Sequence, residues 1–477
     1  MKGARNGLAA AALAMGAVTL RLAYHLWFSS WELVGDEAYY WVESRHLDFG
    51  YVEKGPLLPW TIALSCRLFG DTELAVRLPA IAAFSLAAWG IGWIGLTVGG
   101  SRVAFLSVAT FCLIPAFQAN AQLATQDALV IALWVALTAA GLRLFRRWRA
   151  GSSTWGPWFL LWLLAGIGTL LKQTAVLFLP SVALYAFLER RRLPWRRSLV
   201  FQQLAGFALF LACVSPMIVW NARHGWPMLA HTLGHLGAGG DRPGPVDRAH
   251  PVASLLSILG GLAGAAGPAF LLLLAFAMRQ VEREGDDRLR RETRWLLCAA
   301  APGVVFFVLL ALTKPVVASW PLPALVPLVV PVALLLAGPR GRDRRVRTAW
   351  RVLIGYGLAA QLLLFFPAPL ARLPFFGGRI ARDVLSRFSG RREQARTVEA
   401  LAAGTQTADG RPPLIVAPHY MDASLLTFYM AGHPTVIPAG APNGRRPTSF
   451  DVWPDTRPDS PALAGRARIV VGPFSGP

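Results

Sequence analysis

The sequence predicts an all-α membrane protein that crosses the bilayer many times and ends in a small extracytoplasmic α/β domain. Three observations support this prediction. The 477-residue chain is 55% hydrophobic and only 15% charged, whereas about a quarter of the residues in an ordinary soluble domain are charged. Eleven apolar segments come close to the length of about 20 residues that a membrane helix needs. Clusters of arginine recur between these segments in a regular order.

The apolar segments follow one another through the first three quarters of the chain. They occupy residues 8–28, 74–98, 103–119, 127–145, 157–171, 174–188, 199–219, 252–278, 295–312, 321–338 and 352–368. The first segment has a basic start and an alanine-rich core, which would also suit a cleaved signal peptide. Because its apolar stretch continues past Arg21 and no clean small-residue cleavage site follows, we expect a first membrane helix instead.

Basic residues are grouped between the apolar segments. Clusters follow the fourth, sixth, eighth and tenth segments, at residues 143–149, 190–197, 279–294 and 340–351. If the chain crosses the bilayer eleven times, these clusters and the N-terminus lie on one side, which the positive-inside rule makes cytoplasmic. The first loop and the C-terminal segment then lie outside the cytoplasm. The net charge of +21 does not predict nucleic-acid binding, because the basic residues form separate clusters rather than one face.

The last hundred residues differ in composition from the rest of the chain. "PPLIVAPHY" predicts a short strand, "MDASLLTFYMAG" a helix ending at Gly432, and "HPTVIPAG" and "ARIVVGPF" further strands. We therefore predict a transmembrane catalytic domain over residues 1–371, with its first outer loop at 30–72, and an extracytoplasmic α/β domain over 372–477. The Pro and Gly content leaves a disordered tail as the alternative.

Charged residues that the positive-inside pattern does not require gather at the predicted outer boundary. They are Asp36, Glu37, Glu53, Lys54, Asp127, Lys172 and Lys314. Charges at membrane depth are costly, so those that occur usually face a cavity or a site. A carboxylate can take a proton from an acceptor hydroxyl, and lysines can neutralise a phosphate that leaves with its lipid. The pattern predicts an enzyme that acts on a lipid phosphate.

Structural interpretations compete with the catalytic one at each of these positions. Asp36 and Glu37 could cap a short helix through its N-terminal N–H groups, and Asp127 could cap the fourth apolar segment. The lysines could extend from helix ends toward lipid headgroups. His231 and His235 are four residues apart and would share one face of a helix, as a metal site requires, but such a pair in an interfacial loop is more often structural.

Several motifs resemble those of a known class of enzymes. "GDEAYYW", "GYVEKGPLLPW" and "LFGDTELAVRLPA" resemble the start of the GT-C membrane glycosyltransferases, in the branch of the lipid A aminoarabinose transferases and the protein O-mannosyltransferases. "ATQDALVIALW", "LLKQTAVLFLP", "NARHGW" and "TSFDVWPD" are similar to later landmarks of the same branch. The resemblance covers most of the chain, and the opening loop is its most specific part.

The resemblance implies a fold, a reaction and a location. The fold is the GT-C fold, with about eleven transmembrane helices and a first outer loop whose interfacial helices cover a cavity. The reaction moves a sugar, with inversion, from a polyprenyl-phosphate donor to a hydroxyl or phosphate of a glycolipid, polysaccharide or protein acceptor at the outer face of the inner membrane. A lipid-linked sugar transporter or flippase is the alternative, which broken helices with charges near mid-membrane would favour. A non-catalytic subunit is a third possibility.

Individual site residues also follow from the resemblance. Asp36 matches the catalytic carboxylate, Asp127 a second acidic position, and Lys54 and Lys172 match contacts to the donor phosphate. The full predicted site comprises catalytic Asp36, Glu37 and Asp127; phosphate-binding Lys54, Lys172 and Arg223; and substrate-binding Tyr39, Tyr40 and His224.

The chain departs from the family pattern at two positions. Gly55 follows Lys54 where the family often has proline, and Tyr39 stands where the aminoarabinose transferases carry a basic residue, which argues against aminoarabinose as the sugar. Some relatives bind a divalent metal beside the glutamate that precedes the lysine. Glu53 keeps that position, so a divalent metal ion is the one cofactor that the resemblance leaves open.

Overall fold

The computed structural model divides the chain into two compact units, which are described separately. It describes residues 2–29, 31–236, 251–284, 286–314, 316–366, 387–405, 410–439, 447–457 and 460–472. The helical unit comprises Met1–Trp27, Ala80–Ser215 and Asp247–Phe365. The loop unit comprises Phe28–Pro79, Pro216–Val246 and Phe366–Pro477.

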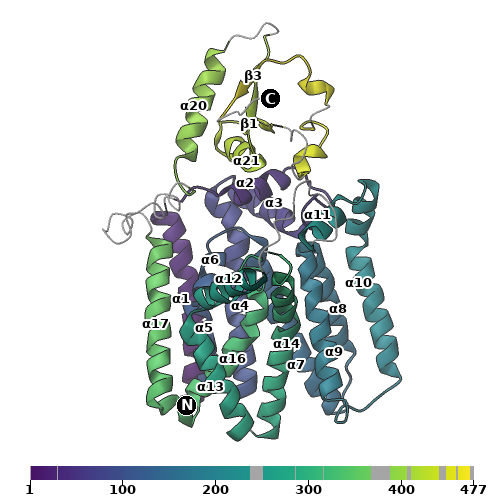
Figure 1. Ribbon diagram of the computed structural model, residues 1–477, viewed down its shortest axis with the longest axis vertical. Coiled ribbons are helices and arrows are strands. Elements are labelled where there is room, and N and C mark those ends of the chain that lie inside the picture. Colours follow the sequence, from purple (N-terminus) through teal and green to yellow (C-terminus); the bar gives the residue numbers. More distant parts are fainter. Residues whose placement is uncertain are drawn as a thin grey trace. The chain divides into compact units, whose positions relative to one another are not determined.

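Helices make up most of the helical unit, and several of the longer ones run side by side (Figure 1). They are α1 (Lys2–Trp27), α4 (Glu73–Gly99, its first residues in the loop unit), α5 (Ser101–Leu113), α6 (Pro115–Asn120), α7 (Gln126–Arg149), α8 (Trp155–Leu171), α9 (Leu179–Leu188), α10 (Ser198–Arg223, its end in the loop unit), α12 (Pro251–Ala266), α13 (Pro268–Glu284), α14 (Asp287–Ala311), α15 (Leu322–Leu325), α16 (Val329–Ala337) and α17 (Arg344–Phe365). Each predicted apolar segment thus overlaps at least one of these helices.

Breaks between these helices have local causes. Lys172, at φ −152° and ψ 126°, ends α8 before a 3₁₀ turn, η1 (Gln173–Phe178). Gly267, at φ 90°, separates α12 from α13, which meet at 89°. A positive φ of this kind costs glycine little because it has no Cβ. The apolar segment predicted at 252–278 is therefore not one straight helix.

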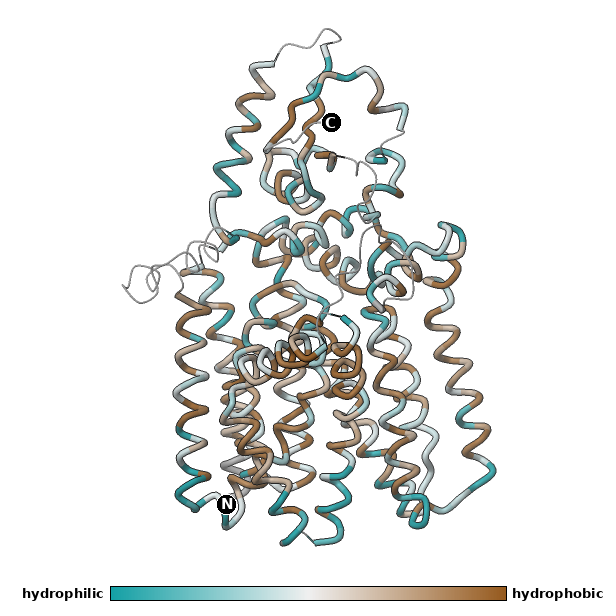
Figure 2. The backbone as a smooth tube through the Cα atoms, in the orientation of Figure 1, coloured by the Kyte–Doolittle hydropathy of each residue, from teal (hydrophilic) through white to brown (hydrophobic). Residues whose placement is uncertain are grey.

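Six helices are long and apolar enough to cross a membrane, or seven if α12 and α13 form one bent span, in the part of the chain that the structure describes. Five further apolar helices have 10–17 residues. Large apolar side chains such as Leu86, Trp89 and Phe201 are more than 60% exposed, as expected for helices that face lipid. Apolar residues run along the long helices and hydrophilic ones gather at their ends (Figure 2). The count of eleven crossings stays a prediction.

The loop unit contains short helices and a small sheet. The helices are α2 (Gly35–Glu43), α3 (Leu57–Phe69), α11 (Pro227–Leu236), α20 (Arg391–Gly404) and α21 (Tyr420–Tyr429), with 3₁₀ turns η4 (Ser449–Asp451) and η5 (Pro461–Leu463). The strands are β1 (Leu414–Ala417), β2 (Ile437–Pro438) and β3 (Arg468–Val470), in the order β2-β1-β3. Both pairings are parallel, with Val416 opposite Ile437 and Ile415 opposite Ile469. Parallel neighbours need a crossover connection, and α21 provides it between β1 and β2.

These strands and α21 form where the sequence predicts them, and Gly432 follows α21 at φ 72°. Helix α20 was not predicted. The predicted domain boundary at residues 371 and 372 lies outside the described residues. The two compact units do not separate at that boundary. The opening loop belongs to the same unit as residues 366–477.

Candidate active site

Helix α2 positions the acidic motif of the opening loop. Val34 is extended and precedes the helix, and the Glu37 side chain accepts a hydrogen bond from the Val34 backbone N–H at 3.1 Å. Asp36 and Glu37 therefore lie in the first turn, where the free N–H groups of a helix favour negative charge. The capping interpretation holds for Glu37.

Glu37 is committed to a buried ion pair. Its carboxylate is 0% exposed and accepts two hydrogen bonds from Arg77, at 2.9 Å from Nε and 2.8 Å from Nη2. Arg77 also donates to the backbone carbonyls of Trp31 and Glu32, at 3.0 and 2.9 Å. All three nitrogens of this guanidinium thus donate hydrogen bonds. This geometry favours a structural role for Glu37 over the predicted catalytic one.

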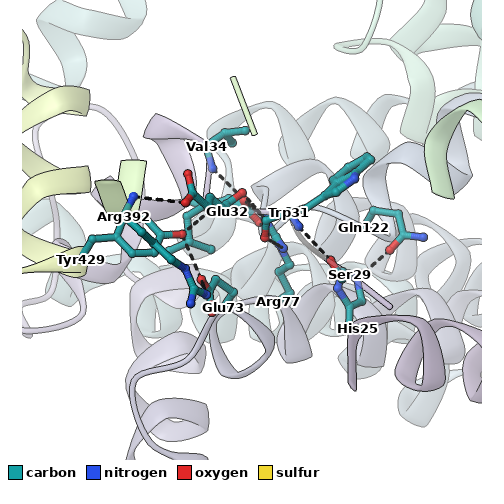
Figure 3. A network of polar contacts seen from close by, with 12 residues as sticks. His25, Ser29, Trp31, Glu32, Val34, Glu73, Arg77, Gln122, Arg392 and Tyr429 are labelled. Atoms are coloured by element: carbon teal, nitrogen blue, oxygen red, sulfur yellow. Dashed lines mark hydrogen bonds and ion pairs between the residues drawn. The ribbon is translucent and has the colours of Figure 1, made fainter. Parts of the chain in front are cut away.

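The same arginine belongs to a wider network in the loop unit (Figure 3). The Glu32 carboxylate accepts the backbone N–H groups of Arg391 and Arg392, at the start of α20. Glu73 pairs with the Arg392 side chain and accepts the Tyr429 hydroxyl at 3.2 Å. The network ties the loop before α2 to α20 and α21, so these distant segments fold as one body.

Lys54 lies within the opening loop as a half-buried cation. Its ammonium group hydrogen-bonds the Tyr40 hydroxyl and lies 4.3 Å from the centre of the Tyr40 ring. Burial would lower the pKa of Lys54, but Tyr40, Glu53 and Asp36 together raise it above its usual value. Lys54 therefore stays protonated at neutral pH and can meet an anionic ligand as a full positive charge.

Asp36 and Glu53 flank this cation with carboxylates that remain available. Both are half-buried, and neither accepts a hydrogen bond or forms an ion pair with any residue that the structure describes. Burial raises the pKa of the Tyr420 hydroxyl in α21, and the negative charges of Glu53 and Asp36 raise it further. The loop therefore presents two unpaired carboxylates around one lysine, an arrangement suited to proton transfer beside a phosphate.

Tyr39 packs inside the loop unit. Its ring is 0% exposed, with its centre 4.7 Å from that of Tyr420, and its hydroxyl accepts the Ser449 backbone N–H at 2.8 Å. Tyr40 is also buried, and it holds Lys54 in place. The geometry gives Tyr39 a packing role and Tyr40 a positioning role, rather than the predicted direct contact with substrate.

Glu43, at the end of α2, was not predicted as a site residue. One of its carboxyl oxygens accepts the Ser449 hydroxyl at 3.0 Å, and the other is buried without a partner among the described residues. Burial raises the pKa of Glu43 to about 8, against the opposing influence of Lys54. The "TSFDVWPD" motif explains this contact, because its Ser449 and Trp453 pack on the opening loop. The motif was a usable signal, but its partner could not be known from sequence.

The end of α10 contacts the same loop. Trp220 donates from its indole nitrogen to Asp48 at 2.7 Å, and its ring stacks on His224 at 4.2 Å between ring centres. The His224 Nδ1 lies 2.7 Å from the Trp220 carbonyl oxygen. Arg223 is exposed, and its side chain makes no hydrogen bond or ion pair within the described ranges. Arg223 is therefore available to an anion, whereas His224 is held by Trp220.

Asp127 and Lys172 form their own pair in the helical unit. The Lys172 ammonium lies 2.5 Å from the Asp127 carboxylate, and both side chains are at most 20% exposed. The adjoining pocket is lined by Trp134, Phe307 and Trp320, and its free volume of 10 Å³ is about that of one water position. The break after α8 directs Lys172 to this carboxylate. The catalytic role of Asp127 and the phosphate contact of Lys172 remain predictions.

The described residues do not fit a divalent metal site. They contain no group of three or more His, Cys, Asp or Glu side chains that could hold an ion. Glu53 has the charge of Lys54 beside it, which opposes a second cation. His231 and His235 do share one helix face, with their Nε2 atoms 3.0 Å apart.

The fold is that of the GT-C membrane glycosyltransferases. The crystal structure of ArnT from Cupriavidus metallidurans in the apo state aligns with a TM-score of 0.61, at 18% identity, over 90% of this chain and 86% of that one. The same protein has been solved bound to undecaprenyl phosphate, and that structure aligns with a TM-score of 0.60. The predicted GT-C fold is confirmed, whereas the number of membrane crossings and the extracytoplasmic C-terminal domain stay predictions.

Sequence comparisons agree with the fold. Residues 53–220 match the family described as dolichyl-phosphate-mannose-protein mannosyltransferase. The lipid A galacturonosyltransferase RgtD of Rhizobium johnstonii is 24% identical over 80% of this chain and 77% of its own length. The undecaprenyl phosphate-alpha-4-amino-4-deoxy-L-arabinose arabinosyl transferase of Aeromonas hydrophila is 31% identical over 32% of this chain and 28% of its own length. The protein is a multi-pass membrane glycosyltransferase, and the prediction of an enzyme rather than a transporter is confirmed.

Proposed function

We propose that this glycosyltransferase moves a sugar from a polyprenyl-phosphate donor to a hydroxyl or phosphate of a glycolipid such as lipid A. The observation that carries the proposal is the protonated Lys54 with two unpaired carboxylates beside it, on the loop that the family motif marks. One named relative is a lipid A galacturonosyltransferase, which suggests the acceptor. The other is named for an undecaprenyl-phosphate sugar, which suggests the donor.

The residues of the loop define a simple displacement. The acceptor oxygen forms a bond to the anomeric carbon while the bond from that carbon to the phosphate oxygen breaks, so the sugar is inverted. Asp36 receives the proton of the acceptor. The electron pair leaves with the polyprenyl phosphate, whose growing charge Lys54 stabilises. Tyr40 holds Lys54 in place, and Arg223 supplies a second cation for the departing phosphate.

The proposal also assigns sides of the membrane. The arginine clusters and the N-terminus face the cytoplasm, and the opening loop and the C-terminal segment face outward from the inner membrane. A polyprenyl-phosphate sugar used at that face arrives with its headgroup already outside. No step above requires a divalent metal ion.

The test is sugar transfer in membranes that contain the wild type, Asp36→Asn or Lys54→Met, with a panel of radiolabelled polyprenyl-phosphate sugars. One donor should be consumed by the wild type, and each substitution should slow its turnover by about a hundredfold or more at equal protein level. Asp455→Asn is the matched control, because this carboxylate lies in the same unit, is 51% exposed and only approaches His46 at 3.6 Å. Undiminished turnover in Asp36→Asn would remove this residue from the site.

A further inference from the structure

A second cavity lies in the helical unit, formed by residues that the proposed reaction does not use. Its volume is about 400 Å³, within the usual range of roughly 300–1,000 Å³ for small-molecule sites. Of the helices around it, α5 packs against both α16 and α17. All three can be followed in Figure 1. The lining residues are Arg102, Phe105, Leu106, Leu336, Gly341, Arg347 and Trp350.

A tight turn shapes one wall of this cavity. The 3₁₀ turn η3 (Pro339–Arg342) folds back on the end of α16, so that a Cβ on Gly341 would lie 2.3 Å from the Leu336 carbonyl oxygen. Only glycine allows this close approach of backbone to backbone. The turn connects α16 to α17 and contacts both helices. Arg347 and Trp350 lie within the first two turns of α17.

Every polar side chain in the lining is a hydrogen-bond donor. Arg102 and Arg347 carry guanidinium groups, and Trp350 carries an indole N–H. None of the three side chains makes a hydrogen bond or ion pair with the rest of the described chain. Asp343 is the nearest acid in sequence to Arg347, yet it is not in the lining and pairs with neither arginine. A ligand that satisfies these donors must be rich in acceptor oxygens and negatively charged.

The remaining lining is apolar and belongs to membrane helices. Phe105, Leu106 and Leu336 are hydrocarbon surfaces next to the two arginines. Arginine and tryptophan side by side at the end of a membrane helix are typical of the headgroup region. Arg102 and Arg347 follow the second and the tenth apolar segments, so both fall on the side of the other arginine clusters, where basic pockets between helices bind anionic lipid headgroups.

We propose that this cavity binds one anionic phospholipid, whose phosphate lies between Arg102 and Arg347 and whose acyl chain lies along Phe105, Leu106 and Leu336. The lipid would bridge α5 to α16 and α17 and so stabilise this end of the helical unit. The site is independent of the sugar-transfer reaction, since none of its residues belongs to the candidate active site.

The test is native mass spectrometry of the full-length purified protein titrated with phosphatidylglycerol. We expect one tightly bound lipid in the wild type and roughly tenfold or weaker binding in the Arg102→Gln/Arg347→Gln variant, because two charge-assisted contacts are lost. Arg344→Gln/Arg345→Gln is the matched control, since these arginines are exposed on the same helix end but do not line the cavity. It should bind like the wild type.

Competitors identify the part of the lipid that is recognised. Phosphatidylcholine should not displace the bound phosphatidylglycerol, and soluble glycerol phosphate should displace it only at far higher concentration. Because both arginines are exposed and unpaired, their replacement should leave thermal unfolding in lipid-free detergent unchanged, which separates lost binding from lost folding. Equal lipid retention in the double variant and the control would overturn the proposal. Equally strong binding of glycerol phosphate would instead assign the site to a free phosphate and overturn it as a lipid site.

Discussion

Burial assigns different roles to the acidic residues of α2. Asp36 is half-buried and unpaired within the described chain, Glu37 is enclosed with Arg77, and Glu43 is enclosed without a cation in direct contact. Carboxyl groups of the same type thus become a candidate base, a structural anion and a neutral acid because their surroundings differ. The roles can be separated by experiment.

Glu37→Gln should lower the stability of the protein, whereas Asp36→Asn should abolish its activity and leave its stability nearly unchanged. Removing the Glu37 charge leaves the Arg77 guanidinium buried and uncompensated, which typically costs about 3–5 kcal/mol. We therefore expect Glu37→Gln to lower the thermal unfolding temperature of the purified protein markedly. Asp36→Asn should leave that temperature within a degree or two, about the effect of a neutral surface change, while it abolishes sugar transfer. A fully stable but inactive Glu37→Gln variant would return Glu37 to the list of catalytic candidates.

The pKa of Glu43 predicts a pH dependence of stability. A carboxyl with a pKa of about 8 in the folded protein and about 4.5 otherwise binds its proton more tightly when folded. The free energy of unfolding should therefore fall as the pH rises from about 4.5 to about 8. Glu43→Gln should remove this decline and unfold at a higher temperature than the wild type at pH 9.

The measurement is thermal unfolding at a series of pH values, with exposed Glu393→Gln as the control. Parallel curves for wild type and Glu43→Gln would contradict the pKa.

At the scale of elements, α2 and α21 pack closely because a glycine begins α2. A Cβ on Gly35 would lie 2.5 Å from the Cβ of Met421 in α21. The network of Glu32, Glu73 and Tyr429 also connects the loop to α20 and α21. The acidic motif is therefore positioned by segments nearly 400 residues away in the chain.

Gly35→Ala should force these two helices apart. The clash involves atoms fixed to both backbones, so no side-chain rotation relieves it, and we expect about 1–3 kcal/mol of destabilisation with reduced sugar transfer. Met421→Gly removes the opposing Cβ and should recover part of the loss when combined with Gly35→Ala. The check is a double-mutant cycle on thermal unfolding. Gly16→Ala in α1, where nothing lies within 4 Å, is the neutral control. Strict additivity in the cycle would contradict the proposed contact.

At the scale of the whole molecule, charge decides how the chain is threaded through the membrane. Three of the arginine clusters are joined by ion pairs within the helical unit, because Arg146 binds Glu292 at 2.6 Å and Arg192 binds Asp287 at 3.2 Å. Residues from separate predicted loops thus meet at one end of the unit, as eleven crossings would require. The pairing supports a common side for the clusters and does not by itself identify that side.

Cysteine labelling in intact cells tests the orientation. In a variant whose four native cysteines are replaced by alanine, Arg344→Cys should be protected from a membrane-impermeant maleimide until the inner membrane is opened. Arg466→Cys, in the C-terminal segment, should react once the reagent reaches the outer face. Both expectations follow from the positive-inside rule. Labelling of Arg344→Cys before the inner membrane is opened would reverse the assigned topology.

The class of the fold could be predicted from the sequence alone, and the sequence also proposed the opening loop as the candidate site. Apolar segments of membrane length and arginine clusters are local patterns, and they depend on the bilayer rather than on any particular partner. The short strands and α21 were likewise predictable because their signals lie within a few residues. The opening loop stood out because Asp36, Glu53 and Lys54 are adjacent to apolar sequence that cannot bury isolated charges cheaply.

Which of those charged side chains have an ion-pair partner among the described residues depends on the tertiary structure. Glu37 and Asp36 are neighbours in sequence, and nothing local shows that Arg77 pairs with one of them and leaves the other unpaired. Glu43 could not be predicted as a site residue, because its contact with Ser449 comes from a segment hundreds of residues further along the chain. The predicted count of eleven crossings stays a prediction, since helices such as α8 and α9 are shorter than a full span. Pairing and burial are properties of contacts between distant segments, and residue composition carries no information about which distant segments meet.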